Sequence, residues 1–167
     1  MPKQLLIMRH AKSSWDDSRL SDFERPLNER GHKDAPRMAE FLLQRQSLPA
    51  WIASSTAVRA RQTAELFLQN CPPDTNIRLE LVDEFYHAPA RIYLRYLSQL
   101  NEVGTDSVML VGHNPGLEEL FRQLAGRSEH FPTAAIAKFS VEAESWGQFS
   151  AELCKLIEFW RPKQVLD

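Results

Sequence analysis

The chain has 167 residues, of which 43% are apolar, with a formal net charge of −2 and a pI near 6.2. This length suits one domain with a buried core, so we expect a single domain over residues 1–167. The charge gives no basis for a surface that binds nucleic acid or a membrane, and no segment approaches the length of a membrane span. The absence of a signal-peptide pattern and of metal or redox spacing between the two cysteines favours a cytoplasmic protein. The sequence is silent on the oligomeric state, for which a monomer is favoured.

Apolar runs of strand length alternate with segments of helical periodicity, which is typical of a layered α/β sheet. The predicted strands lie at about residues 4–8, 51–54, 77–81 and 107–111, and residues 134–141 and 149–159 predict a hairpin of strands. The predicted helices carry their apolar positions within residues 35–43, 57–68, 92–100 and 117–124. We therefore expect a three-layer α/β/α sandwich with a mostly parallel central sheet and an antiparallel edge.

Several residues predict where the helices begin. Pro36 is expected in the first turn of its helix, where its missing N–H costs least. Ser55-Thr56 offers capping side chains before the second helix. Asn114-Pro115 predicts a cap followed by proline at the first helical position, and Gly126 predicts the end of that helix.

Two of the apolar runs end abruptly in a histidine. His10 follows the first run, with Arg9 directly before it, and His113 follows the run at residues 108–112. Ligand sites in open α/β sheets lie beyond the carboxyl ends of such strands, so both side chains are expected at one edge of the sheet. Arg59 falls in the first turn of the helix after the second strand, where free N–H groups and the helix dipole favour an anion.

Together, these two histidines and two arginines form a set suited to phosphoryl chemistry. A guanidinium group offers a forked donor that matches phosphate oxygens, and phosphoryl transfer needs little beyond positioning and charge neutralisation. Neighbouring guanidinium groups also lower the pKa of His10, which keeps a ring nitrogen free to attack. A turn residue is the alternative role for either histidine alone, but their joint placement favours a function. The scheme requires no cofactor, and the five histidines show no metal-ligand spacing.

The motifs together resemble the histidine phosphatase superfamily, which has the phosphoglycerate mutase-like fold. The small size of the chain and two further segments point to the SixA-like phosphohistidine phosphatase branch. The segments that carry the resemblance are residues 8–11 (MRHA), 25–31 (RPLNERG), 54–60 (SSTAVRA), 111–114 (VGHN) and 133–137 (TAAIA).

The resemblance implies a role for each matching residue. His10 would be the nucleophile that becomes phosphorylated, and Arg9 and Arg59 would bind the phosphoryl oxygens. His113 would stabilise the transferred group as a hydrogen-bond donor. Arg25 would be a further phosphate-binding arginine, and a surface charge on a long loop is its alternative role.

The chain departs from the family pattern at the proton donor. The mutase and acid-phosphatase branches carry a carboxylic acid after the third strand, within a longer insertion, whereas this chain has residues 83–88 there and returns directly to helix. An alkoxide leaves only with help from an acid, but the conjugate acid of imidazole titrates near neutrality. The short segment therefore favours a P–N bond over a sugar phosphate. Glu84 and His87 remain candidate donors, with polar residues at a helix start as the alternative.

These observations predict a metal-independent phosphatase that hydrolyses phosphohistidine on a protein through a phosphohistidine intermediate. A phosphatase for small phosphomonoesters or phosphoramidates, with Glu84 or His87 as the acid, is one alternative. A non-catalytic domain that binds a phosphorylated partner is the other. A chain without a capping insertion is expected to leave the pocket open, with residues 12–22 at its rim.

Overall fold

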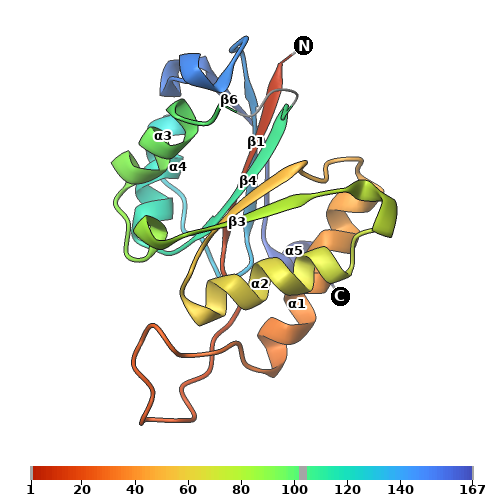
Figure 1. Cartoon of the computed structure of the whole chain (residues 1–167), viewed down its shortest axis with the longest axis vertical. Helices are drawn as coiled ribbons and strands as arrows, with labels where there is room; N and C mark the ends of the chain where they lie inside the picture. Colours follow the sequence, from red (N-terminus) through yellow and green to blue (C-terminus); the bar gives the residue numbers. More distant parts are fainter. Residues whose placement is uncertain (1, 102–104, 167) are drawn as a thin grey trace.

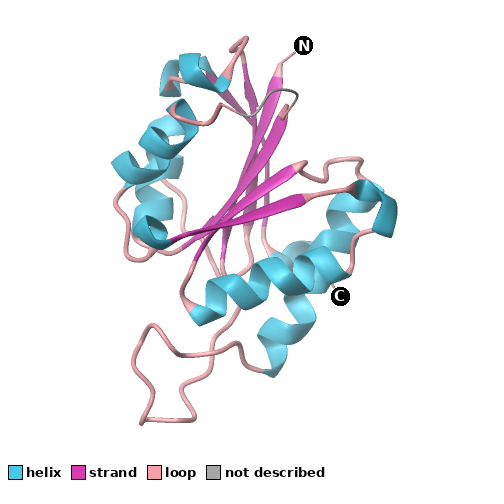
Figure 2. Cartoon of the chain, in the orientation of Figure 1, coloured by secondary structure: helices cyan, strands magenta, loops and turns pink. Residues whose placement is uncertain are grey.

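In the computed structural model, which describes residues 2–101 and 105–166, six strands form one sheet between two layers of helices (Figures 1 and 2). The strands are β1 (Lys3–Arg9), β2 (Trp51–Ser55), β3 (Arg78–Val82), β4 (Ser107–Gly112), β5 (Ile136–Val141) and β6 (Cys154–Trp160). The helices are α1 (Glu29–Gln44), α2 (Val58–Gln69), α3 (Ala90–Ser98), α4 (Gly116–Ala125) and the short α5 (Pro162–Val165).

The strands follow the order β3-β2-β4-β1-β5-β6 across the sheet. The first four strands of the chain are parallel, whereas β5 runs antiparallel to β1 and to β6. The central strands β1 and β4 are buried along almost their whole length, which explains their nearly continuous apolar sequences. The predicted three-layer sandwich with a mostly parallel sheet and an antiparallel edge is confirmed.

The sheet separates two apolar cores. Leu5 and Ile7 of β1 face the core under α3 and α4, whereas Leu6 and Met8 face the core under α1 and α2. This division follows from the alternation of side chains along a strand. Each of these side chains is fully buried, which contributes roughly 1.5–3 kcal/mol to the free energy of unfolding. The two cores fix β1, and hence the position of the residues that follow it.

Helix α1 begins earlier than predicted. Its N-cap is Asn28, whose Oδ1 accepts the N–H of Gly31 at 2.9 Å. Pro36 therefore lies inside the helix, and its placement in the first turn was wrong. Proline removes one intrahelical hydrogen bond, but α1 still buries an apolar stripe that includes Met38. Tertiary packing outweighs that loss.

The starts of α2 and α4 also differ from the prediction. Ser55-Thr56 does not cap α2, because Ala57 is the N-cap and makes no side-chain bond. Pro115 is the N-cap of α4 rather than its first residue, and the amide of Asn114 donates to the carbonyl of Phe131 at 2.9 Å. The Asn114 side chain makes a tertiary contact instead of a cap, and Oγ of Ser55 bonds both to the N–H of Ala57 and to His113.

The remaining connections agree with the sequence. A long loop joins β1 to α1, and an isolated bridge between Ser13 and Leu27 ties its two halves together. Gly126 ends α4 with a φ of 76°, a conformation that favours glycine. No helix in the described part of the chain is long and apolar enough to cross a membrane.

Candidate active site

The two histidines at the sheet edge lie next to each other. The register of the parallel strands β1 and β4 pairs Arg9 with Gly112, so His10 and His113 each follow by one residue. The backbone N–H of His10 donates to the carbonyl of Gly112 at 3.1 Å. The centroids of the two imidazole rings are 5.1 Å apart. The adjacent strands thus bring together two histidines that are 103 residues apart in the chain.

The hydrogen bonds of His10 define which ring nitrogen is free. Its Nδ1 lies 2.7 Å from the carbonyl of Ala11, and a carbonyl only accepts, so Nδ1 carries the proton. The other nitrogen, Nε2, accepts from Nε of Arg59 at 3.4 Å. Burial lowers the pKa of His10 well below its usual value, and the nearby charges of His113, Arg59 and Arg9 lower it further. His10 is therefore neutral at pH 7, with the lone pair of Nε2 directed at Arg59.

His113 is oriented by Ser55, at the end of β2. Its Nε2 lies 2.8 Å from Oγ of Ser55, which also accepts the N–H of Ala57 at 3.2 Å. These three groups are all satisfied when the serine hydroxyl donates to Nε2, which places the histidine proton on Nδ1. Burial, followed by the charge of Arg59, lowers the pKa of His113 to about 3. His113 is then a neutral hydrogen-bond donor.

Gly112 and Tyr93 hold the backbone before His113. The hydroxyl of Tyr93, on α3, accepts the N–H of His113 at 3.4 Å. A Cβ on Gly112 would collide with this hydroxyl and with the tyrosine ring. The glycine in the Val-Gly-His segment is therefore required for close packing of α3 against the end of β4.

Arg9 and Arg59 approach the histidines from β1 and from the first turn of α2. One terminal nitrogen of Arg9 donates to the carbonyl of Phe131 at 3.0 Å, and its Nε has no partner among the described residues. Burial lowers the pKa of Arg9, although the charge of Glu118 opposes this. Arg59 is almost fully buried and directs Nε at His10. Both guanidinium groups lie beside the histidine pair, where an anion would offset their cost of burial.

Arg25 reaches the same edge from the long loop. Its terminal nitrogen donates to Oγ of Ser13 at 2.8 Å and to the carbonyl of Ser14 at 3.2 Å. The guanidinium group lies 3.5 Å from the ring centroid of Trp15, and the residue is 8% exposed. Arg25 is thus held by its own loop rather than extended into solvent, and no described contact joins it directly to either histidine.

Asp22 connects these cations, and it was not among the residues predicted for the site. Its Oδ2 accepts from Arg59 at 3.1 Å and from the hydroxyl of Tyr86 at 2.6 Å, and its Oδ1 accepts from Arg25 at 3.2 Å. Burial raises the pKa of the Asp22 carboxyl, but Tyr86, Arg59 and Arg25 lower it more, so the pKa lies well below the usual range. The carboxylate is therefore ionised and bound by two of the expected phosphate-binding arginines.

This contact changes the expectation of an open pocket. His10 and His113 are only 5% and 3% exposed, and the loop carries Asp22 across to Arg59 and Tyr86. Electrostatic attraction between the carboxylate and the guanidinium groups accounts for this closed arrangement. The histidine pair is therefore less exposed than the absence of a capping insertion suggested.

The two candidate proton donors lie in different places. Nε2 of His87 is 3.4 Å from Oδ2 of Asp22, and its ring centroid is 6.2 Å from that of His113. Glu84 instead lines a depression over α3, with Arg95 among its neighbours, and makes no described contact with the histidine pair. The structure therefore brings His87, but not Glu84, to the edge of the site.

The comparisons with known proteins agree with this geometry. The sequence model of the histidine phosphatase superfamily (branch 1) matches residues 5–86. A solved SixA structure from Agrobacterium tumefaciens is 31% identical to the chain, covers 97% of it and 99% of its own length, and superposes with a TM-score of 0.81. The chain belongs to the histidine phosphatase superfamily. Within the superfamily, the structural match places it in the SixA-like branch.

Two curated relatives extend the similarity over most of the chain. The phosphohistidine phosphatase SixA of Escherichia coli is 28% identical over 90% of this chain and 92% of its own. An uncharacterized protein of Mycobacterium tuberculosis is 32% identical over 93% of this chain and all of its own. The family and its SixA-like members support a phosphatase activity for this histidine phosphatase superfamily protein.

The site has the groups that phosphoryl transfer needs. His10 offers a free ring nitrogen, and the guanidinium groups and His113 offer donors for the phosphoryl oxygens. Within residues 2–101 and 105–166, no group of three or more His, Cys, Asp or Glu side chains is arranged to hold a metal ion.

Proposed function

We propose that this protein hydrolyses phosphohistidine on a protein substrate through a covalent intermediate at His10. In the first step, Nε2 of His10 attacks phosphorus, and the P–N bond to the substrate imidazole breaks as that ring takes up a proton. In the second step, water attacks the phosphoryl group on His10, which releases inorganic phosphate and restores the enzyme.

The buried polar atoms without partners carry this proposal. Among the described residues, these side-chain atoms are Nε of Arg9, Nδ1 of His113 and Oδ1 of Asn114. All three belong to residues at the carboxyl edge of β1 and β4. Buried donors are nearly always hydrogen-bonded in folded proteins, so Arg9 and His113 present donors that a bound oxyanion would satisfy. His10 and Arg59 complete the set beside them.

The surroundings of His10 favour the first step. A neutral imidazole with its proton fixed on Nδ1 keeps the lone pair of Nε2 available. Arg59 Nε, 3.4 Å from Nε2, lies where negative charge accumulates as the phosphoryl group is transferred. Arg9, Arg25 and His113 bind the remaining phosphoryl oxygens in this proposal.

The leaving group favours phosphohistidine over an alkyl phosphate. The imidazole leaving group takes up a proton near neutral pH, so it needs less acid assistance than an alkoxide. Only His87 of the two candidate acids lies beside the site, and its side chain is 61% exposed. A protein-borne substrate also fits the loop, because Trp15 is 72% exposed there and aromatic side chains are enriched at protein interfaces.

The proposal is tested by phosphate release from a histidine-phosphorylated protein and from an aryl phosphate ester, side by side. We expect the wild type to prefer the phosphohistidine substrate, and His10→Ala to abolish the activity. His130→Ala is the matched control, because the His130 side chain is exposed and its described hydrogen bond goes to Glu118.

Other outcomes point to the alternatives. Equal or greater activity on the ester would overturn the phosphohistidine assignment and indicate a proton donor in the site. His87 would then be the first candidate donor to test. No activity on either substrate would favour a domain that binds a phosphorylated partner without hydrolysing it.

A further inference from the structure

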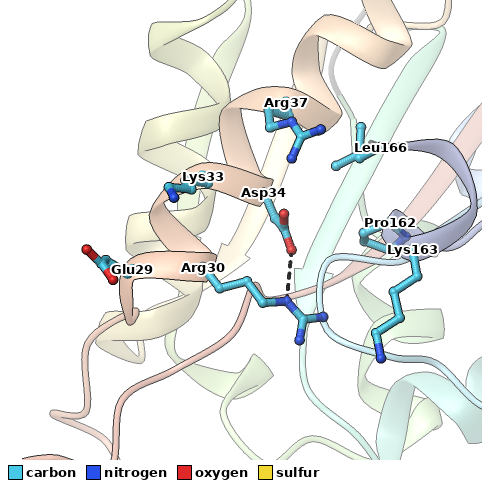
Figure 3. Close-up of a pocket in the computed structure, with 8 residues that line it drawn as sticks. All are labelled: Glu29, Arg30, Lys33, Asp34, Arg37, Pro162, Lys163 and Leu166. Atoms are coloured by element: carbon cyan, nitrogen blue, oxygen red, sulfur yellow. Dashed lines mark hydrogen bonds and ion pairs between the residues drawn. The ribbon is translucent and has the colours of Figure 1, made fainter.

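A basic pocket lies on α1 and α5, outside the histidine cluster (Figure 3). Its volume is about 430 Å³, and its walls include Pro162 and Leu166 of the C-terminal segment. The cations that line it are Arg30, Lys33, Arg37 and Lys163. Figure 3 shows Arg37 and Lys163 on either side of the ion pair between Arg30 and Asp34. The pocket thus has a positive rim and an apolar wall.

The charges of this pocket are mostly uncompensated. Arg30 donates to Asp34 at 3.3 Å. Lys33, Arg37 and Lys163 are exposed and make no hydrogen bond or ion pair with any described residue. Four cations against two carboxylates stand out in a chain whose net charge is −2. Free cations clustered on an otherwise acidic protein favour an acidic partner.

The pocket lies at the same edge of the sheet as the active site. In the sheet register, Met8 of β1 pairs with Ile136 of β5, which pairs with Trp160 of β6. The ends of β1 and β6 are therefore level, and Lys163 follows β6 as His10 follows β1. The start of α1 also lies near this edge. The N–H of its N-cap, Asn28, donates at 2.9 Å to the carbonyl of Lys12, which lies three residues after the end of β1.

A second depression links the basic pocket to the active-site loop. Its volume is about 700 Å³, and it shares Glu29 and Arg30 with the basic pocket. From there it extends to Ser14 and Pro26, in the loop that carries Arg25 and Asp22 into the site. The two depressions meet at these shared residues at the start of α1, and we refer to them together as the groove. Its cations lie at the α5 end, whereas Asp16 and Glu29 line the part nearer the loop.

We propose that this groove docks an acidic segment of the phosphohistidine-bearing substrate protein. The proposal rests on the proposed function, since it assigns a partner to the same site. A free phosphate ion would need only a compact cluster of donors, whereas these cations rim a pocket of about 430 Å³ that also has an apolar wall of Pro162 and Leu166. An extended acidic segment matches both features and delivers a histidine of the same protein to His10.

Docking of this kind changes the encounter with the substrate and not the chemistry. Charges at the rim of an interface mainly alter the association rate and its dependence on salt. Loss of the positive rim should therefore raise KM for a protein substrate and leave kcat nearly unchanged. A small substrate, which does not reach the groove, should be unaffected.

The test compares the double variant Arg37→Glu/Lys163→Glu with the wild type. The substrates are a chemically phosphorylated histidine phosphotransfer domain with an acidic surface, and free phosphoramidate. For the phosphorylated protein substrate, we expect the double variant to have a kcat/KM at least tenfold lower at low ionic strength, because KM rises. Its kcat/KM should also depend less on salt, and its hydrolysis of phosphoramidate should be unchanged. The control is Arg91→Glu/Lys155→Glu, which makes the same charge change at exposed positions on α3 and the start of β6.

The outcomes separate the two proposals. If Arg37→Glu/Lys163→Glu hydrolyses the phosphorylated protein as well as the wild type does, the docking proposal is overturned and the proposed function stands. An equal loss of activity in the control variant has the same consequence. If the wild type hydrolyses phosphoramidate but not the phosphorylated protein, the proposal of a protein substrate is overturned. The docking proposal then fails as well.

Discussion

We expect Asp22 to compete with a bound phosphoryl group for Arg59 and Arg25. Its carboxylate accepts hydrogen bonds from Arg59 and Arg25, which are the donors that a bound oxyanion would use. If these arginines bind the phosphoryl group as proposed, the substrate displaces the Asp22 carboxylate. The Asp22→Asn substitution keeps the size of the side chain and removes its charge, so it should strengthen the binding of an oxyanion.

The size of this effect follows from the environment of the ion pair. Hydrogen bonds to charged groups contribute roughly 1.5–3 kcal/mol when they are shielded from water, and exposed ion pairs contribute about 0.2–1 kcal/mol. The side chain of Asp22 is 41% exposed and that of Arg59 is 5% exposed, so their interaction lies between these limits. A difference of about 1.4 kcal/mol corresponds to a tenfold lower Kd for the oxyanion.

Titration calorimetry with tungstate and with inorganic phosphate at pH 7 measures this change. Asp17→Asn is the control, because Asp17 lies on the same loop and its described side-chain bonds go only to Arg19. An unchanged or higher Kd in Asp22→Asn would refute competition and would show that the carboxylate positions Arg59 for binding.

Three further predictions concern the groups around His113. Ser55→Ala removes the hydroxyl that orients His113. Because one hydrogen bond of roughly 1–3 kcal/mol is lost, kcat should fall by about 10- to 100-fold with little change in KM. Steady-state kinetics measure this, and an unchanged kcat would contradict the assigned orientation. Gly112→Ala should lower the free energy of unfolding by about 1–3 kcal/mol, because the added Cβ collides with Tyr93. The loss should exceed that of Gly126→Ala, where the added Cβ meets no atom but φ is positive. Urea denaturation compares the two variants, and equal losses would argue against the collision. Folding lowers the pKa of His113 from 6.5 to about 3, so the unfolded chain is protonated at this histidine before the folded protein is. The contribution of His113 to the free energy of unfolding is therefore complete above pH 6.5, and it declines by up to about 1.4 kcal/mol per pH unit below that pH. Urea denaturation at pH 7 and pH 5 should show a smaller decline in His113→Gln, and an equal decline would contradict the lowered pKa.

The fold and the histidine pair were predictable because their signals are local. The strands before His10 and His113 each contain a continuous apolar run, as expected for strands buried on both faces. Parallel strands then bring their carboxyl ends together, whatever the loops between them do. Arg59 was placed by the same reasoning, because it opens the helix that follows β2.

The parts that depend on tertiary contacts were not predictable in this way. Pro36 was expected to start a helix, because a sequence pattern does not show that the core under α1 compensates a lost hydrogen bond. Asn114 has the chemistry of a cap, but Phe131 binds its amide. Asp22 lies in a polar loop without periodicity, and only the fold brings it to Arg59 and Tyr86. Its spacing of three residues before Arg25 was the one local signal.

The measurement that tests the central claim most directly is the trapping of a phosphorylated enzyme. The protein is mixed with a phosphohistidine substrate, quenched with base within the first turnover, and mapped by peptide mass spectrometry. We expect one phosphoryl group on the peptide that contains His10, absent from His10→Ala and retained in His130→Ala. A phosphoryl group on another residue, or continued turnover by His10→Ala, would contradict it.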